Sequence, residues 1–475
     1  MNLRIDNINR NWFLFVTVMV TLLGGCTLAP EYKRPTAPIP ADWPTGAAYP
    51  ETKPAAPAPT SEGLPWREFF PDERLQKIIA TALNNNRDLR LAALNVERAR
   101  AYYGIQRAEL LPTVQAIGSG SRERVPADLS STGSVKTAER YGVNLGISSW
   151  EIDFFGRIRS LKDRALEEYL ATDEARRGAR ILLVSAVANT YLALAADREA
   201  LKLVATTLET QEASYRLVCK SYDVGLVSKL DLQRAQGQVD AARGEVARYT
   251  QLAAQAENAL QLLVGSSVPT ALLPSDLDSV SPPKEISAGL SSELLLRRPD
   301  VLAAEHRLKA ANANIGAARA ALFPRISLTT ASGTASADLS GLFKDGSGTW
   351  SFVPQITIPI FDARTWSAYD VTKVDREITV AQYEKAIQTA FREVADAMAV
   401  LGTVNRQIAA QQSLVGAAAE TYRLSYARYT KGIDNYLSVL DAQRSLYGAQ
   451  QGLIALHFSR FANLVTLYTM LGGGT

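Results

Sequence analysis

Apolar residues recur at alternating steps of three and four positions along two long stretches of this chain. In the first stretch, about residues 158–222, the recurring positions are Val187, Leu194, Leu201, Val204, Leu208, Tyr215, Val218 and Tyr222. After Gly225 the positions are Leu232, Ala235, Val239, Ala242, Val246, Tyr249, Ala253, Ala256, Leu260 and Leu263. This spacing is typical of a coiled-coil seam, and a helix of about 65 residues would be on the order of 100 Å long. The pattern predicts a long helix that turns at Gly225 and returns as a second helix; a filament-like structural coil would show it too.

A second pattern, with a period of two, predicts β-strands. Tyr141, Val143, Leu145 and Ile147 alternate with polar residues or glycine, and a similar alternation covers residues 350–360. Strands of about ten residues match the span of a transmembrane barrel strand. We expect four strands, at about 112–121, 141–152, 324–335 and 349–361, with polar Gly/Ser-rich loops at 121–140 and 336–348. A small soluble hairpin remains the alternative, since alternation is a weak signal per segment.

The two patterns occur twice, which indicates an internal duplication. The segment 107–112 resembles 319–324, and further landmarks recur at one constant separation: Tyr215 and Tyr422, Gly225 and Gly432, Ala235 and Ala442, Gly265 and Gly472. We therefore expect repeat 1 at 66–265, a linker at 266–290 and repeat 2 at 291–475. Each repeat should run helix, strand, loop, strand, long helix, return helix. The separation between matching residues is larger for Pro112 and Pro324 than for Phe155 and Phe361. This difference predicts that a loop between these landmarks has a different length in the two repeats.

The N-terminus has the layout of a secretory signal, with Arg4 and Arg10 ahead of the apolar run 12–23. The following Leu23-Gly24-Gly25-Cys26 resembles the lipobox at which bacterial lipoproteins are cleaved and acylated. We expect residues 1–25 to be a signal peptide and Cys26 to carry the lipid, which would be palmitate among other acyl groups. Thr27 in place of aspartate resembles the sorting signal for release to the outer membrane. Residues 26–65 contain ten prolines and should form an extended tether.

Composition argues against catalysis, metal binding and nucleic-acid binding. The chain has two histidines, His306 and His457, neither with a second ligand at metal-site spacing. One cysteine, Cys219, remains beside Cys26, which excludes a disulfide within the mature chain. No phosphate-binding loop, nucleophile elbow or His-Glu-x-x-His motif is present, and the net charge of +3 gives no basic footprint for nucleic acid. We expect no enzyme activity, no metal site and no cofactor other than the covalent lipid.

Four strands per chain imply that several copies share one barrel. Four strands cannot close on themselves, and open backbone edges are very costly in lipid. Two copies would give eight strands, whose interior is filled by side chains. Three copies would give twelve strands and an open lumen. A homotrimer is thus the simplest arrangement that leaves a pore.

Several motifs together resemble the TolC-type outer membrane factor family, and most closely its OprM-like (NodT-type) outer membrane efflux lipoproteins. They are the lipobox, Arg298-Pro299-Asp300, the glycines at the two hairpin turns, and the run from Asp434 to Arg444. The resemblance covers nearly the whole mature chain. It implies a mixed α and β membrane protein: a trimeric 12-stranded transmembrane β-barrel, four strands per chain, continuous with a periplasmic α-helical coiled-coil tube, with the inter-repeat linker at its equator.

The resemblance also implies a function and partners. The trimer would be the outer membrane channel of a tripartite multidrug efflux system, lipid-anchored and extending into the periplasm. It would be a passive duct joined by a periplasmic adaptor, or membrane fusion protein, to an inner-membrane RND pump. The alternatives within the family are efflux of heavy-metal cations and type I secretion. From another class, a periplasmic coiled-coil adaptor lipoprotein would share the anchor and hairpins, but not the paired strands of each repeat.

By the same resemblance, the periplasmic gate maps to residues near the hairpin turns. Leu437 and Asp441 would form the constriction, Arg444 would pair with carboxylates, and Tyr429 with Asp231 would latch the two hairpins. Three copies of Asp441 would make a carboxylate ring that attracts cations; an ordinary solvated carboxylate is the alternative. Ser438 stands where TolC itself has a further aspartate, so the ring would carry less charge. The adaptor-docking tips would be Val224, Gly225, Leu226, Gly432 and Ile433.

Overall fold

A computed structural model describes residues 27–49, 65–285 and 292–473, and the described chain divides into two compact units. The predicted signal peptide and Cys26 lie outside the described residues. One unit contains the β-sheet with the helical segments next to it in sequence, at 95–172 and 303–383. The other contains the two helical hairpins and the segments 37–94 and 173–302.

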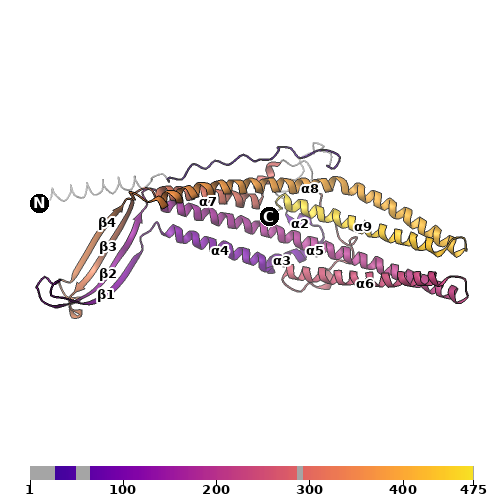
Figure 1. Cartoon of the computed structure of the whole chain (residues 1–475), viewed down its shortest axis with the longest axis horizontal. Helices are drawn as coiled ribbons and strands as arrows, with labels where there is room; N and C mark the ends of the chain where they lie inside the picture. The colour runs from indigo at the N-terminus through magenta and orange to yellow at the C-terminus, as the bar shows by residue number, and fades with distance from the viewer. Residues whose placement is uncertain (1–26, 50–64, 286–291, 474–475) are drawn as a thin grey trace. The chain divides into compact units, whose positions relative to one another are not determined.

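Four antiparallel strands form one sheet in the order β1-β2-β3-β4 (Figure 1). They are β1 Val114–Val125, β2 Lys136–Ile152, β3 Arg325–Ser336 and β4 Gly348–Thr357. The pairing aligns the period-two pattern of the strands, so Ile147 lies between Val114 and Thr330, and Thr330 lies beside Phe352. Apolar side chains thereby gather on one face, where Trp350 is 79% exposed. The sheet has an uncovered apolar face, as a membrane-barrel strand would need.

A bulge in β2 keeps its apolar residues on that face. The register shifts between Ile147 and Trp150, and Ser149 has a positive φ of 52°. An inserted residue reverses the side-chain alternation beyond it. Trp150 and Ile152, which would otherwise point to the opposite face, therefore join Ile147.

The prediction of unequal loops is wrong, because the length difference between the repeats lies in the strands. The loops are nearly equal, at 126–135 and 337–347, whereas β2 has 17 residues and β4 has 10. Strand pairing also covers 121–125 and 136–140, which the Gly/Ser content of the first loop had assigned to the turn. Polar residues such as Arg122 and Glu139 occupy these strand ends and form an ion pair at 3.0 Å.

Glycines permit the close approach of β2 and β3. A Cβ atom on Gly333 would lie 2.1 Å from the carbonyl oxygen of Val143. We expect Gly333→Val to destabilise the sheet by about 1–3 kcal/mol or more, because this overpacking meets backbone that cannot move aside. The matched control is Gly118→Val in β1, where a Cβ meets nothing within 4 Å. The heat stability of the detergent-purified protein on gels measures the effect; equal stability of the two variants would contradict it.

The helices follow the predicted repeat order. They are α2 Trp66–Phe69, α3 Glu73–Asn85, α4 Arg87–Ala108, α5 Arg157–Asp223, α6 Lys229–Val264, α7 Pro299–Ala320, α8 Ala363–Thr430 and α9 Tyr436–Met470, with short 3₁₀ turns η2 Thr270–Leu272, η3 Ser292–Arg297 and η4 Leu339–Gly341. Pro112 and Pro324 follow α4 and α7, as expected of residues that cannot continue a helix. The two long helices, α5 and α8, have 67 and 68 residues.

The 3,4-spaced seam is the buried side of the hairpin helices. Val187, Leu194 and Val218 of α5 are buried, as are Val239 and Leu260 of α6. Tyr222, at the end of the predicted seam, is exposed. By length and composition one stretch of α5 could also cross a membrane, and 44% of it is buried. Its buried residues pack in a protein core, so the stretch belongs to the seam.

In the sheet-containing unit, the two outer helical segments expose apolar residues. His306 of α7 contacts Glu167 of α5 at 2.6 Å, and Arg319 of α7 contacts the Tyr369 hydroxyl of α8 at 3.1 Å. His306 is therefore a packing residue, as the sequence indicated. The exposed apolar residues are Tyr102 and Ile105 of α4 and Trp366, Val371, Val374 and Ile378 of α8. These surfaces and the edge strands β1 and β4 are uncovered in a single copy.

Candidate functional site

The two helical hairpins are joined near their turns by a tyrosine-rich apolar cluster, which we call the tip cluster. Its buried residues come from three of the four hairpin helices: Val218 of α5, Ala235 of α6, and Tyr436, Val439 and Leu440 of α9. Partly buried residues pack around it: Tyr215, Val227, Leu232, Tyr422 and Tyr429. Figure 1 shows both hairpins, α5–α6 and α8–α9, turning back at the same end. The cluster therefore holds the two repeats together beside their turns.

The turns themselves are built alike in the two hairpins. Gly225 and Gly432 have φ of 75° and 70°, a conformation that favours glycine. Each next helix starts with a side-chain cap: Ser228 caps α6 and Asn435 caps α9. Arg428 and Asp434 form a bidentate ion pair, at 2.6 and 2.9 Å, across the second turn. These contacts fix the turns and leave their apolar side chains outside.

The predicted docking residues are exposed at these turns. Val224 and Leu226 project from the first turn and Ile433 from the second. These three aliphatic side chains are not part of the buried core, and they do not lie on a β-strand. The structure thus provides a small apolar surface on each turn, as the docking prediction requires.

The predicted gate residues divide into two groups. Tyr429 packs in the tip cluster, with its ring 5.2 Å from that of Tyr436. Leu437, Asp441 and Arg444 lie on the exposed side of α9, where an Arg444 nitrogen is 3.8 Å from Asp441 Oδ1. One copy of the chain therefore has Asp441 in solvent, beside a cation one turn away.

Asp231 is a helix-capping residue as well as a candidate latch. Its carboxylate accepts hydrogen bonds from Ser228 N and Oγ, at 3.3 and 2.6 Å. Burial raises the pKa of Tyr429, and the negative charge of Asp231 raises it further. No hydrogen bond joins the two side chains among the described residues, so the latch stays a prediction.

The sequence did not single out Tyr436, the central residue of the tip cluster. It is 3% exposed and lies between the two hairpins. A signal was present, because Tyr422, Tyr426, Tyr429 and Tyr436 crowd into a short segment around a glycine turn. Tyrosines at this spacing indicate a packed aromatic cluster. The remaining residues of the tip cluster, however, come from some two hundred positions earlier in the chain.

The burial of Tyr436 predicts a pH dependence. Burial raises its pKa to about 12 from the ordinary 10.0, because the phenolate would lose its hydration. A raised folded-state pKa stabilises the folded protein below pH 10, and this stabilisation is lost as the pH rises from 10 through about 12. We expect protease cleavage at the hairpin turns to increase over that range, and less steeply in Tyr436→Phe. Identical pH profiles for the two proteins would refute this assignment.

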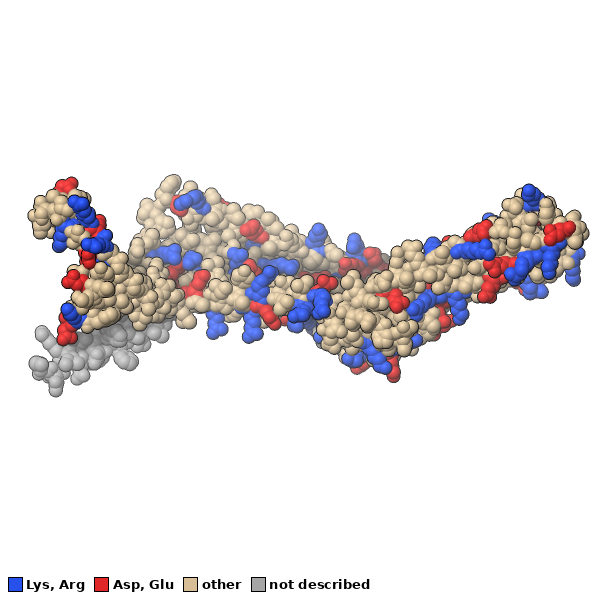
Figure 2. All heavy atoms as spheres, turned by 90° about the horizontal axis from the view of Figure 1, so that it is seen from below, with Lys and Arg blue, Asp and Glu red and all other residues tan. Residues whose placement is uncertain are grey.

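On one face of the molecule, the surface charge near the hairpins is of mixed sign. Figure 2 shows basic and acidic side chains interspersed on the face it displays. Many are paired within one helix turn, for example Arg423 with Glu420 and Arg248 with Glu245. Among the described residues, no group of three or more His, Cys, Asp or Glu side chains could hold a metal ion.

Comparison with known proteins identifies relatives over almost the full chain. The profile of the outer membrane efflux protein family matches residues 78–266 and 290–473. The antibiotic efflux pump outer membrane protein ArpC of Pseudomonas putida is 50% identical over 465 residues, 97% of this chain and 95% of the relative. The toluene efflux pump outer membrane protein TtgC of P. putida has the same identity and coverage. The open-state MtrE outer membrane channel of Neisseria gonorrhoeae is 37% identical, with a TM-score of 0.83 over 94% of this chain and 98% of that one.

Proposed function

This chain belongs to the outer membrane efflux protein family, and from that premise we propose that it is the exit duct of a tripartite pump that expels antibiotics and organic solvents. It is an outer membrane efflux channel, a conduit and not an enzyme, with the TolC-type fold expected from its sequence. The proposal adds the cargo, the partners, the lipid anchor and the gate. The cargo follows from the names of two relatives that share half of its residues.

One observation carries the proposal: the sheet has an uncovered apolar face and two open edges, β1 and β4. Open edges are not tolerated in lipid, so β1 of one copy must pair with β4 of the next. The exposed apolar residues of α4 and α8 supply a second pair of surfaces between copies. Three copies close into twelve strands with a lumen.

The partners are a periplasmic adaptor and an inner-membrane RND pump. The exposed aliphatic residues of the turns, Val224, Leu226 and Ile433, are the docking points for the adaptor. Their small apolar surfaces suit helical hairpin ends of similar character. A covalent lipid on Cys26 holds the protein at the outer membrane from the periplasmic side.

Gene deletion tests the cargo. Cells that lack this channel should lose resistance to hydrophobic antibiotics and to toluene and regain it with the intact gene. Unchanged resistance to these compounds, together with new sensitivity to copper or silver salts, would instead support the heavy-metal alternative. Loss of a secreted protein from the medium would support type I secretion.

The gate residues have a direct electrical test. We expect Asp441→Ala combined with Tyr429→Phe to raise the closed-state conductance of single channels in planar bilayers. The double change removes the proposed carboxylate ring and the Tyr429 hydroxyl of the proposed latch, and a closed state held by only a few contacts opens when they are lost. The matched control is Glu420→Ala, an exposed carboxylate with Arg423 three residues on. An unchanged conductance in the double variant would contradict the gate assignment.

A further inference from the structure

A pocket lies where the β-strands meet the helices of the sheet-containing unit. It has a volume of about 370 Å³ and is lined by the segments 151–157, 320–326 and 357–359. Phe155 and Phe323, one from each repeat, stack at its wall with ring centroids 5.0 Å apart. Ala320, Pro324 and Pro359 add further apolar surface. The strand–helix junction is thus hollow and partly apolar.

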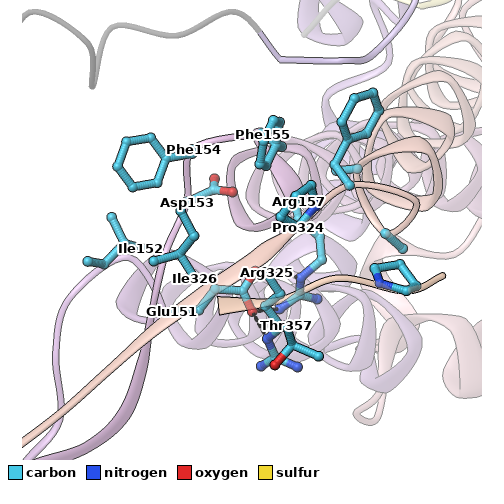
Figure 3. Close-up of a pocket in the computed structure, with 14 residues that line it drawn as sticks. Glu151, Ile152, Asp153, Phe154, Phe155, Arg157, Pro324, Arg325, Ile326 and Thr357 are labelled. Carbon is cyan, nitrogen blue, oxygen red and sulfur yellow. Dashed lines mark hydrogen bonds and ion pairs between the residues drawn. The ribbon is translucent and has the colours of Figure 1, made fainter. Parts of the chain in front are cut away.

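Three of the four charged residues that line the pocket pair with one another, and the fourth, Asp153, pairs with Arg159 outside the lining. Glu151 accepts two hydrogen bonds from Arg157, both at 2.8 Å, and lies 2.6 Å from Arg325. Figure 3 shows these three side chains converging, with the rings of Phe154 and Phe155 away from them. The single carboxylate of Glu151 is thus the common partner of both arginines. The free surface of the pocket is therefore its aromatic side.

The N-terminal tether runs along α7 toward this pocket. Tyr32 and Arg34 bind Glu305, Asn312 donates to the carbonyl of Pro30 at 2.8 Å, and Arg319 donates to the carbonyl of Leu28 at 3.1 Å. The tether and α7 therefore run antiparallel: Arg34 lies beside Glu305, and Leu28 lies beside Arg319 near the C-terminal end of α7. The next α7 residues, 320 and 321, already line the pocket.

Two glycines bring the tether close to the helices at this end. A Cβ atom on Gly316 would lie 2.7 Å from Ala29 N, and one on Gly156 would lie 2.9 Å from Thr27 Cα. Gly156 stands between Phe155 and Arg157, both of which line the pocket. Cys26 is one peptide unit, about 3.8 Å, beyond Thr27. Thr27, the residue after the predicted lipid attachment point, therefore lies at the edge of the pocket.

We propose that one acyl chain attached to Cys26 lies in this pocket, against Phe154, Phe155 and Phe323, rather than entering the bilayer directly. The proposal rests on the lipid anchor of the proposed function. The occupant is an apolar chain attached to the residue that precedes Thr27, where the described part of the tether begins. In the pocket, the methylene groups of the acyl chain and the aromatic side chains of the wall are removed from water together. The lipid would then fasten the strand–helix junction as well as anchor the protein.

Photocrosslinking of the native, full-length protein tests this. Cells are grown with a diazirine-bearing fatty acid, their membranes are irradiated, and the digested protein is analysed by mass spectrometry. We expect the Cys26 lipopeptide to be joined to peptides containing residues 152–155 or 320–326. Phe323→Ala should lose most of this crosslink, whereas Phe361→Ala, an exposed phenylalanine outside the pocket, should retain it. Gly316→Val, whose side chain would clash with Ala29 of the tether and also with Ser160 of α5, should also lose it.

The possible failures are distinguishable. A Cys26 peptide without any lipid would overturn the anchor and the pocket assignment together. A lipidated Cys26 joined to phospholipid alone, or to outward-facing residues such as Trp350, would overturn the pocket assignment and leave the anchor. Pocket peptides joined to a phospholipid instead of the Cys26 peptide would show that a free membrane lipid is the occupant, and would equally overturn it.

Discussion

Tyr436→Ala is expected to open the hairpin end of the channel. Tyr436, on the α8–α9 hairpin, is 3% exposed and packs with Val218 and Ala235 of the α5–α6 hairpin. Removing a buried aromatic side chain costs about 3–5 kcal/mol through lost burial and the cavity left behind. Here the loss falls on the contact between the hairpins, since each hairpin retains its own turn, cap and seam. A change of about 1.4 kcal/mol already shifts a two-state equilibrium tenfold, so the closed state should cease to dominate.

Single-channel recordings in planar bilayers measure this result. We expect Tyr436→Ala channels to conduct continuously at a level well above that of the parent's closed state. Tyr426→Ala is the matched control, because Tyr426 is on the same hairpin but is exposed and outside the tip cluster. Were Tyr436→Ala channels to stay closed while folding and assembling normally, the tip cluster would not be the latch. Thermal unfolding of both variants shows whether the change is confined to the tip.

How far the sequence predicts this site depends on where each partner lies in the chain. Glycine turns, capping residues and exposed tip aliphatics are local features, and Gly225 and Gly432 located both turns. The tip cluster depends on contacts between residues of different repeats, such as Val218 and Tyr436. Spacing within one helix carries no information about which distant helix faces it. Asp441 was found by resemblance alone, and its environment in a single copy is ordinary.

The fold was predictable to a greater extent because its signals repeat. A seam that continues over many turns predicts the ends of a long helix accurately. The observed α5 begins and ends within one residue of the expected range. The strands were less well specified. Polar strand ends such as Arg122 and Glu139 have the composition of a loop, and only their cross-strand pairing makes them β-structure. The bulge beside Ser149 could not be predicted either, because a register shift of one residue leaves no clear pattern of its own in the sequence.

Arg298→Ala is expected to cause the largest loss of stability in the helical part of the chain. Arg298 is 7% exposed and joins three elements: it binds both carboxylate oxygens of Asp300 at 3.0 and 2.8 Å, Glu393 of α8 at 2.9 Å, and the carbonyl of Met470 at the end of α9 at 2.9 Å. Losing a hydrogen bond to a charged group costs about 1.5–3 kcal/mol, and the carboxylates left behind, Asp300 and Glu393, are 54% and 28% exposed and so remain partly hydrated. The total stability of a folded domain is only about 5–15 kcal/mol.

Comparison with Arg298→Lys separates charge from geometry. Lysine keeps the positive charge but cannot form the planar, forked contacts to Asp300 while also reaching Glu393 and Met470. We therefore expect an intermediate loss of stability in Arg298→Lys, measured as the midpoint of thermal unfolding in detergent. Arg364→Ala, which removes an exposed arginine paired with Asp362, should have no measurable effect. If alanine and lysine at position 298 were equally harmless, the end of α9 would be held by apolar packing, chiefly the stack of Phe69 on Tyr468 at 4.2 Å, and not by the arginine.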